Sequence, residues 1–85
     1  MFAIELFLKG SPIPVIVERK EKDGAQALYN LIIEAIASGH PNVLQLTCEK
    51  QIDKNVALLT DQICGVQISE KNSSASVTGV GFGRY

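Results

Sequence analysis

The stretch DGAQALYNLIIEAIASGHP, residues 23–41, predicts the helix that decides the fold. Asp23 is a residue type favoured at helix N-caps, and Gln26 stands at the third helical position, as in a capping box. Gly39 suits the left-handed position that follows a helix, and Pro41 prevents the helix from continuing. We therefore expect one helix that starts after Asp23 and ends just before Gly39.

The apolar residues of this helix cover a wide part of its surface. At about 100° per residue they fall on one arc of roughly 200°, about twice the width that an ordinary surface helix needs. The helix therefore has more apolar surface than contact with one sheet requires. The residues of the arc are Ala25, Leu28, Tyr29, Leu31, Ile32, Ile33, Ala35 and Ile36.

Two runs before the helix alternate between apolar and other residues, which indicates strands. In residues 2–9 the even positions are apolar, and in residues 13–19 the odd positions are apolar. Turn-forming residues 10–12 separate the runs, so together they predict an antiparallel hairpin. Because Pro12 and Pro14 cannot donate to a ladder, the second strand starts late or lies at a sheet edge.

Three shorter runs after the helix predict three more strands. Residues 43–49 alternate, residues 56–59 are apolar, and residues 63–69 carry apolar side chains around Gly65. The polar residues 50–55 between the first two runs indicate a hairpin loop. A glycine within a strand suggests a bulge or a close approach of another chain segment.

This order, strand–strand–helix–strand–strand–strand, predicts a single α+β domain in which one helix packs on an antiparallel sheet. From residue 71 onwards serine and glycine dominate and the periodicity is lost. We therefore expect a domain of residues 1–70 followed by a flexible Ser/Gly-rich tail, residues 71–85. The side chains expected beneath the helix are Ile4, Leu6, Val15, Val17, Leu44, Leu46, Val56, Leu58, Val66 and Ile68.

Length and charge exclude several classes of protein. A chain of 85 residues is one domain. Eight Lys and Arg stand against nine Asp and Glu, whereas a nucleic-acid-binding module usually has a basic excess, so we expect no nucleic acid as partner. No apolar run approaches the ~20 residues that cross a bilayer, and the N-terminus lacks the basic segment of a secretory signal. We expect no membrane insertion and a cytoplasmic location.

No residue pattern points to catalysis or to a bound metal. His40 is the only histidine, whereas a catalytic zinc site takes about three protein ligands. Cys48 lies on the apolar side of its strand and is expected in the core, and neither it nor Cys64 has a neighbouring base. The Gly-rich run 79–83 lacks the following helix that a phosphate-binding loop needs. We therefore expect no catalytic residue, no metal site, no cofactor and no enzymatic activity.

Surplus apolar residues are the main functional indication in the chain. With the core filled, the opposite sheet face still carries apolar side chains, and such patches on small proteins usually mark an interaction surface. The alternative is that the tail or a loop folds back over them. The tail ends in VGFGRY, residues 80–85, which is either an unstructured end or a short docking peptide. The candidate interface residues are Phe7, Ile16, Val43, Leu59, Phe82, Arg84 and Tyr85.

We therefore predict a small non-enzymatic protein-interaction module, either a homodimer or an accessory part of a larger assembly. A second hypothesis is a small-molecule-binding or catalytic protein whose site forms between subunits. The residues that would have to converge in such a site are His40, Cys48, Glu49 and Cys64. A third hypothesis, nucleic-acid binding, requires a basic cluster in space. The residues of that cluster would be Lys20, Lys22, Lys50 and Lys54.

Three segments resemble a family of small uncharacterised cyanobacterial proteins. They are QALY at residues 26–29, LTCEK at 46–50 and VQISEK at 66–71, and the likeness covers residues 1 to about 71. The LTxEK pattern, the following VxI strand and VGFG at 80–83 are more distantly similar to small uncharacterised actinobacterial proteins. The resemblance implies a cytoplasmic, cyanobacterial protein of unknown function and assigns no catalytic residue.

Overall fold

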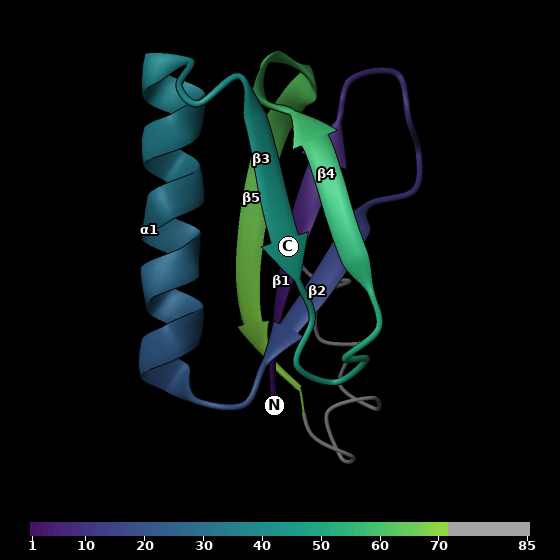
Figure 1. The fold of residues 1–85 in the computed structure, drawn as a ribbon, viewed down its shortest axis with the longest axis vertical. Helices are drawn as coiled ribbons and strands as arrows, with labels where there is room; N and C mark the ends of the chain where they lie inside the picture. The colour runs from purple at the N-terminus through teal and green to yellow at the C-terminus, as the bar shows by residue number, and fades with distance from the viewer. Residues whose placement is uncertain (72–85) are drawn as a thin grey trace, which may run out of the picture.

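The computed structural model describes residues 1–71, which form five strands, one α-helix and a short 3-10 helix (Figure 1). This confirms the predicted α+β class and the predicted order of strands and helix. Of the predicted tail, residues 71–85, only Lys71 is described, so Phe82, Arg84 and Tyr85 lie outside the described residues. The elements are β1 (Phe2–Leu8), β2 (Val15–Arg19), α1 (Lys22–Ser38), β3 (Val43–Thr47), β4 (Asn55–Leu59), η1 (Thr60–Gln62) and β5 (Ile63–Glu70).

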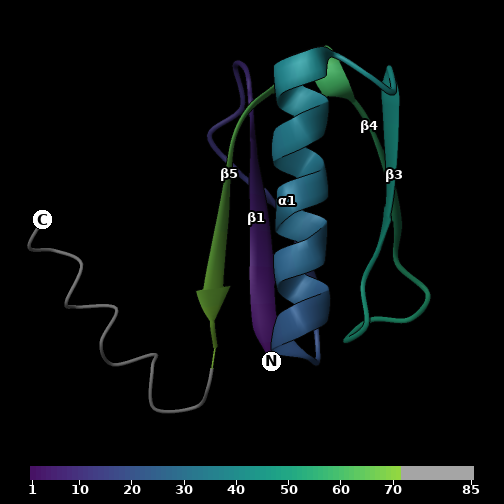
Figure 2. The same ribbon diagram turned by 90° about the vertical axis from the view of Figure 1, so that its left-hand side faces the viewer.

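The strands form two antiparallel sheets, where the sequence predicts one. β1 lies between β2 and β5 in a three-stranded sheet, and β3 pairs with β4 in a two-stranded sheet. Figure 2 shows the two sheets as separate layers, with α1 alongside both. β2 and β3 run in the same direction (Figure 1), because α1 carries the chain back along the molecule between them. The helix therefore moves the second hairpin out of the plane of the first.

The segment that follows β3 joins the two sheets along the outer edge of β2. The backbone N–H of Glu49 donates to the Glu18 carbonyl oxygen at 2.9 Å. The Lys54 ammonium donates to the Ile16 carbonyl oxygen at 2.7 Å. These bonds occupy backbone groups that would otherwise make the edge of β2 available for pairing with another chain.

The core lies between the two sheets and beneath the helix. Ile4 and Leu6 of β1 belong to one buried cluster with Leu44 and Leu46 of β3. All ten residues predicted for the core are found in it or packed against it, although those of β3 and β4 reach it from the second sheet. The half-buried members are Val15, Val56, Leu58, Val66 and Ile68.

The start of α1 differs from the prediction. The helix begins at Lys22, its N-cap is Glu21, and no side chain caps it. The predicted capping box of Asp23 and Gln26 is therefore wrong. The Gln26 side chain instead donates to Asn30 Oδ1 at 3.1 Å, because residues four apart lie side by side on a helix surface.

The end of α1 is as predicted. Gly39 adopts a left-handed conformation with φ of 79°, and its N–H donates to the Ala35 carbonyl oxygen at 2.8 Å. The wide apolar arc is only partly covered, since Leu31 and Ile33 at its two margins are 50% and 41% exposed. Of the helices formed by residues 1–71, none is long and apolar enough to cross a membrane.

Candidate functional site

The four predicted interface residues within the sheets lie on outer faces, but on opposite sides of the molecule. Phe7 and Ile16 belong to β1 and β2, whereas Val43 and Leu59 are cross-strand partners in the hairpin of β3 and β4. Because the two sheets enclose the core between them (Figure 2), their outer faces point away from each other. The prediction that all four share one sheet face is therefore wrong, since the helix divides the sheet in two.

Phe7 has a structural role in its own sheet. It pairs with Gly65 of β5, and the ladder shifts register between Phe7 and Leu8, which confirms the irregularity expected at this glycine. A methyl group in place of the Gly65 hydrogen would lie 3.6 Å from the Phe7 ring. The ring therefore covers the backbone where β5 has no side chain. Ile16 is half-buried and Phe7 is 37% exposed, so this outer face also carries exposed apolar surface.

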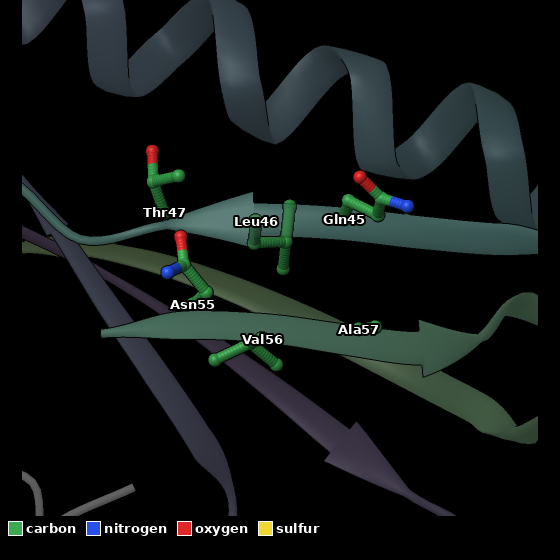
Figure 3. A pocket seen from close by; sticks show the side chains of 6 residues that line it. All are labelled: Gln45, Leu46, Thr47, Asn55, Val56 and Ala57. Atoms are coloured by element: carbon green, nitrogen blue, oxygen red, sulfur yellow. The ribbon is translucent and has the colours of Figure 1, made fainter. Parts of the chain in front are cut away.

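The outer face of the hairpin is more open. Val43 is 44% exposed and Leu59 is 56% exposed, and the two lie side by side at one end of the hairpin. Next to them is an open hollow of about 320 Å³ (Figure 3). Gln45 and Ala57, which both line the hollow, lie opposite each other in the ladder. The residues of the described part of the chain that line it are uncharged: Gln45, Leu46, Thr47, Asn55, Val56 and Ala57.

β4 also has an unpaired edge. The N–H of Thr60 donates to the Asn42 carbonyl oxygen at 2.8 Å, which identifies this pair as a hydrogen-bonded pair of the ladder. Because hydrogen-bonded and non-hydrogen-bonded pairs alternate, Asn55, Ala57 and Leu59 direct their backbone groups away from β3. The C=O of Leu59, the N-cap residue of η1, accepts the first hydrogen bond of that 3-10 helix. All three residues are exposed, and no strand within residues 1–71 pairs on that side.

Cys48 is buried, as predicted, at 4% exposure. Burial raises the pKa of its thiol, but hydrogen bonds from the backbone of Gln51, Glu18 and Lys50, together with the charge of Lys54, outweigh that effect. The pKa of Cys48 therefore lies below its ordinary value of 9.0. The N–H of Glu18 is 3.3 Å from the sulphur. A thiolate at this position is stabilised by the segment that joins the two sheets.

The four residues that the second hypothesis brings together in one site do not form a single cluster within one chain. His40 precedes β3 and Cys48 follows it, so the length of the strand separates them. Glu49 accepts a hydrogen bond from the N–H of Lys20 at 2.6 Å, and Cys64 is exposed on β5. Both thiols are free, and the structure of residues 1–71 holds no group of three or more side chains placed to bind a metal ion.

The lysines that a nucleic-acid site requires are balanced by carboxylates. Lys50 lies 3.8 Å from Glu18, and Lys54 donates to the backbone of β2. The stretches 18–23 and 49–54 carry these lysines and meet at the edge of β2. Together they contain five basic and five acidic side chains, so their sum is neutral. The basic residues are Arg19, Lys20, Lys22, Lys50 and Lys54, and the acidic ones are Glu18, Glu21, Asp23, Glu49 and Asp53.

The sequence analysis did not single out Asn55 and Ala57, which form the open edge and line the hollow. The run NVALL at residues 55–59 shows that this strand lacks charge and proline. It does not show which edge stays unpaired, because that depends on how distant strands are arranged.

Comparison with known proteins gives the family. Residues 3–71 match the model of the UPF0367 protein family. A UPF0367 protein of Synechocystis sp. is 57% identical over 76 residues, which cover 89% of this chain and 82% of that protein. A UPF0367 protein of Microcystis aeruginosa is 54% identical over 76 residues, with 89% and 85% covered.

A UPF0367 protein of Prochlorococcus marinus is 46% identical over 82 residues, which cover 96% of this chain and 95% of that protein. These matches confirm the resemblance to small cyanobacterial proteins, and their names assign no activity. The more distant similarity to actinobacterial proteins stays a prediction. This chain belongs to the UPF0367 protein family.

Proposed function

We propose that the protein is a small non-enzymatic interaction module that self-associates through the hairpin of β3 and β4. The observation that carries this proposal is the exposure of Val43 and Leu59 on the outer face of the hairpin, next to the open edge of β4. Burial of apolar surface contributes about 25 cal/mol per Å², so covering two such side chains favours association. The uncharged hollow beside them adds surface that a protein partner can cover.

The burial of Cys48 and the side chains that line the hollow support a non-enzymatic role. The Cys48 side chain lies on the core side of its strand and is 4% exposed, so a substrate has no access to the sulphur. The hollow on the hairpin is lined by amide, hydroxyl and apolar side chains, which do not act as general acids or bases at neutral pH.

The test is the oligomeric state of the full chain, measured by sedimentation velocity over a series of micromolar concentrations. We expect self-association in the wild type and at least about a tenfold weaker association for Leu59→Lys. Ile52→Lys is the matched control, because Ile52 is 82% exposed in the loop between β3 and β4, away from the proposed surface. A wild-type chain that stays monomeric throughout would contradict the proposal.

The lowered pKa of Cys48 favours one alternative, a catalytic or ligand-binding thiol in a site completed by a second subunit. Thiol titration with a coloured disulfide reagent separates the two functions. Our proposal predicts rapid reaction of the exposed Cys64 and reaction of Cys48 only after unfolding. Reaction of Cys48 in the folded protein at the rate of Cys64 would support the alternative.

A further inference from the structure

We propose that residues 49–54 form a strap that closes over the outer edge of β2 when the Cys48 sulphur is ionised and opens when the sulphur is protonated, while the rest of the domain stays folded. The inference does not depend on the proposed self-association, because the strap lies at the opposite end of the hairpin from Val43 and Leu59 (Figure 1). It follows from how the strap is bonded to β2, from how little of it is buried and from the position of the sulphur.

The outer edge of β2 consists of the backbone groups of Ile16, Glu18 and, just after the strand, Lys20. The Lys71 N–H donates to the Met1 carbonyl oxygen, so the odd-numbered residues of β1 bond to β5 and the even-numbered ones bond to β2. The even-numbered residues of β1 pair with odd-numbered residues of β2. The even-numbered residues of β2 therefore direct their N–H and C=O groups outward.

The strap and Cys48 bond to four of these outward groups in place of a neighbouring strand. The bonds run from Glu18 N–H to Cys48 Sγ at 3.3 Å, from Glu49 N–H to the Glu18 oxygen at 2.9 Å, from Lys20 N–H to Glu49 Oε1 at 2.6 Å and from Lys54 Nζ to the Ile16 oxygen at 2.7 Å. A thiol, a carboxylate and an ammonium group thus take part in three of them. The contact is not a β-ladder, and its strength depends on the charge of these side chains.

Little apolar burial holds the strap in place. Residues 49–53 are exposed, Lys54 is half-buried, and Ile52, the one apolar residue of the strap, is 82% exposed. Segments with few buried apolar contacts open locally at a lower free energy than the core. By contrast, Cys48 at the start of the strap is 4% exposed and belongs to the buried cluster. The strap can therefore open while the Cys48 side chain stays in the core.

The Cys48 sulphur is the one acceptor that the strap and β2 share. Burial raises the pKa of the thiol, but hydrogen bonds from the backbone of Gln51 and Lys50 in the strap and of Glu18 in β2, with the charge of Lys54, lower it by more. A charged acceptor makes stronger hydrogen bonds than a neutral one. As the pH falls through the folded pKa, the sulphur therefore loses its hold on both the strap and β2.

The other ionisable groups near the sulphur belong to β2, to the link after it and to the strap. Glu18 lies 3.8 Å from Lys50, whereas β1, β3 and α1 contribute apolar side chains to the cluster that holds Cys48. None of these ionisable residues is fully buried as Cys48 is. The set consists of Glu18, Arg19, Lys20, Glu21, Glu49, Lys50, Asp53 and Lys54.

The test compares the ionisation of Cys48 with the exchange of the amide hydrogens beneath the strap. In the full chain carrying Cys64→Ser, the ultraviolet absorbance of the thiolate follows the ionisation of Cys48 with pH. NMR follows the exchange of the Glu18 and Lys20 amides, corrected for the intrinsic rate at each pH. We expect the protection of both amides to fall at least about fivefold as the thiolate is lost, along the same titration curve.

Val17 and Leu44 are the matched controls, because their N–H groups bond to β1 and β4 and not to the strap. We expect at least about tenfold greater protection at these two residues than at Glu18 and Lys20. Low concentrations of urea should speed exchange at the controls and not beneath the strap, since opening the strap exposes little surface.

The variant Cys48→Ser separates ionisation from hydrogen bonding. A serine hydroxyl accepts hydrogen bonds but does not ionise in this range, so protection beneath the strap should be low and independent of pH. Circular dichroism confirms that the variant retains the fold.

Two results would overturn the strap. Exchange of Glu18 and Lys20 with the rates and the urea dependence of Val17 would show that this edge opens only when the whole domain unfolds. Exchange that does not follow the thiolate titration, or that keeps the wild-type pH dependence in Cys48→Ser, would show that the sulphur does not control the opening. Both results leave the proposed self-association standing, because that function is tested by the oligomeric state.

Discussion

The sulphur of Cys48 links the stability of the fold to pH. Hydrogen bonds from the backbone of Glu18, Lys50 and Gln51 and the charge of Lys54 hold the pKa of the folded thiol below 9.0, despite its burial. Between the folded pKa and 9.0 the unfolded chain binds more protons than the folded chain, so the stability rises with pH in that window. The contribution is complete above 9.0 and is lost as the pH falls through the folded pKa.

We therefore expect the free energy of unfolding of the wild type, relative to Cys48→Ala, to increase as the pH is raised towards 9.0. Urea unfolding followed by circular dichroism at several pH values measures this difference. Cys64→Ala is the control and should keep the wild-type slope, because Cys64 is exposed on β5. An identical pH profile for the wild type and Cys48→Ala would show that the sulphur is not stabilised as a thiolate.

Replacing glycine by alanine is expected to change the stability differently at Gly39 and at Gly65. Gly39 has a φ of 79°, which an L side chain rarely adopts, and it ends α1. Gly39→Ala is expected to lower the free energy of unfolding by about 1 kcal/mol. At Gly65 the new methyl group would touch the Phe7 ring at an ordinary distance of 3.6 Å. Gly65→Ala should therefore be neutral or slightly stabilising, and chemical denaturation of both variants tests the pair.

Among the elements, β2 depends on the segment after β3, because that segment supplies hydrogen-bond donors to the backbone carbonyls on the outer edge of β2. Lys54 is half-buried and donates to the Ile16 carbonyl oxygen, whereas Lys50 is exposed and lies 3.8 Å from Glu18. Lys54→Ala is expected to cost about 1–2 kcal/mol, because it leaves a partly buried carbonyl without its donor. Lys50→Ala should change the stability by less than about 0.5 kcal/mol. Equal losses in thermal unfolding would contradict this assignment.

The elements of this fold are visible in the sequence because each is specified locally. The alternation in residues 2–9 predicts β1 to within one residue, and Gly39 with Pro41 marks the end of α1. The division into two sheets is not visible, because it depends on contacts across thirty residues, such as that of Glu49 with Glu18. For the same reason the sequence places Phe7 and Val43 on one face, although they lie on opposite sides of the molecule.

At the scale of the whole molecule, the arrangement of the two sheets determines which surface is free. The segment after β3 joins the second hairpin to β2, and α1 lies beside β5. Among residues 1–71, this arrangement leaves Val43 and Leu59 exposed on the outer face of the hairpin, and Leu31 and Ile33 exposed on α1. The same connections that complete the small core thus leave apolar side chains exposed on the second hairpin and on the helix.

If copies of the chain associate through the hairpin of β3 and β4, the stability of the domain depends on protein concentration. A partner that binds only the folded state stabilises it by mass action, so the midpoint of thermal unfolding rises with concentration. We expect this rise in the wild type and in Ile52→Lys, and a much smaller dependence on concentration in Leu59→Lys. Calorimetry at several concentrations measures the effect, and a wild-type midpoint that stays constant across the micromolar range would exclude a dimer whose assembly stabilises the fold.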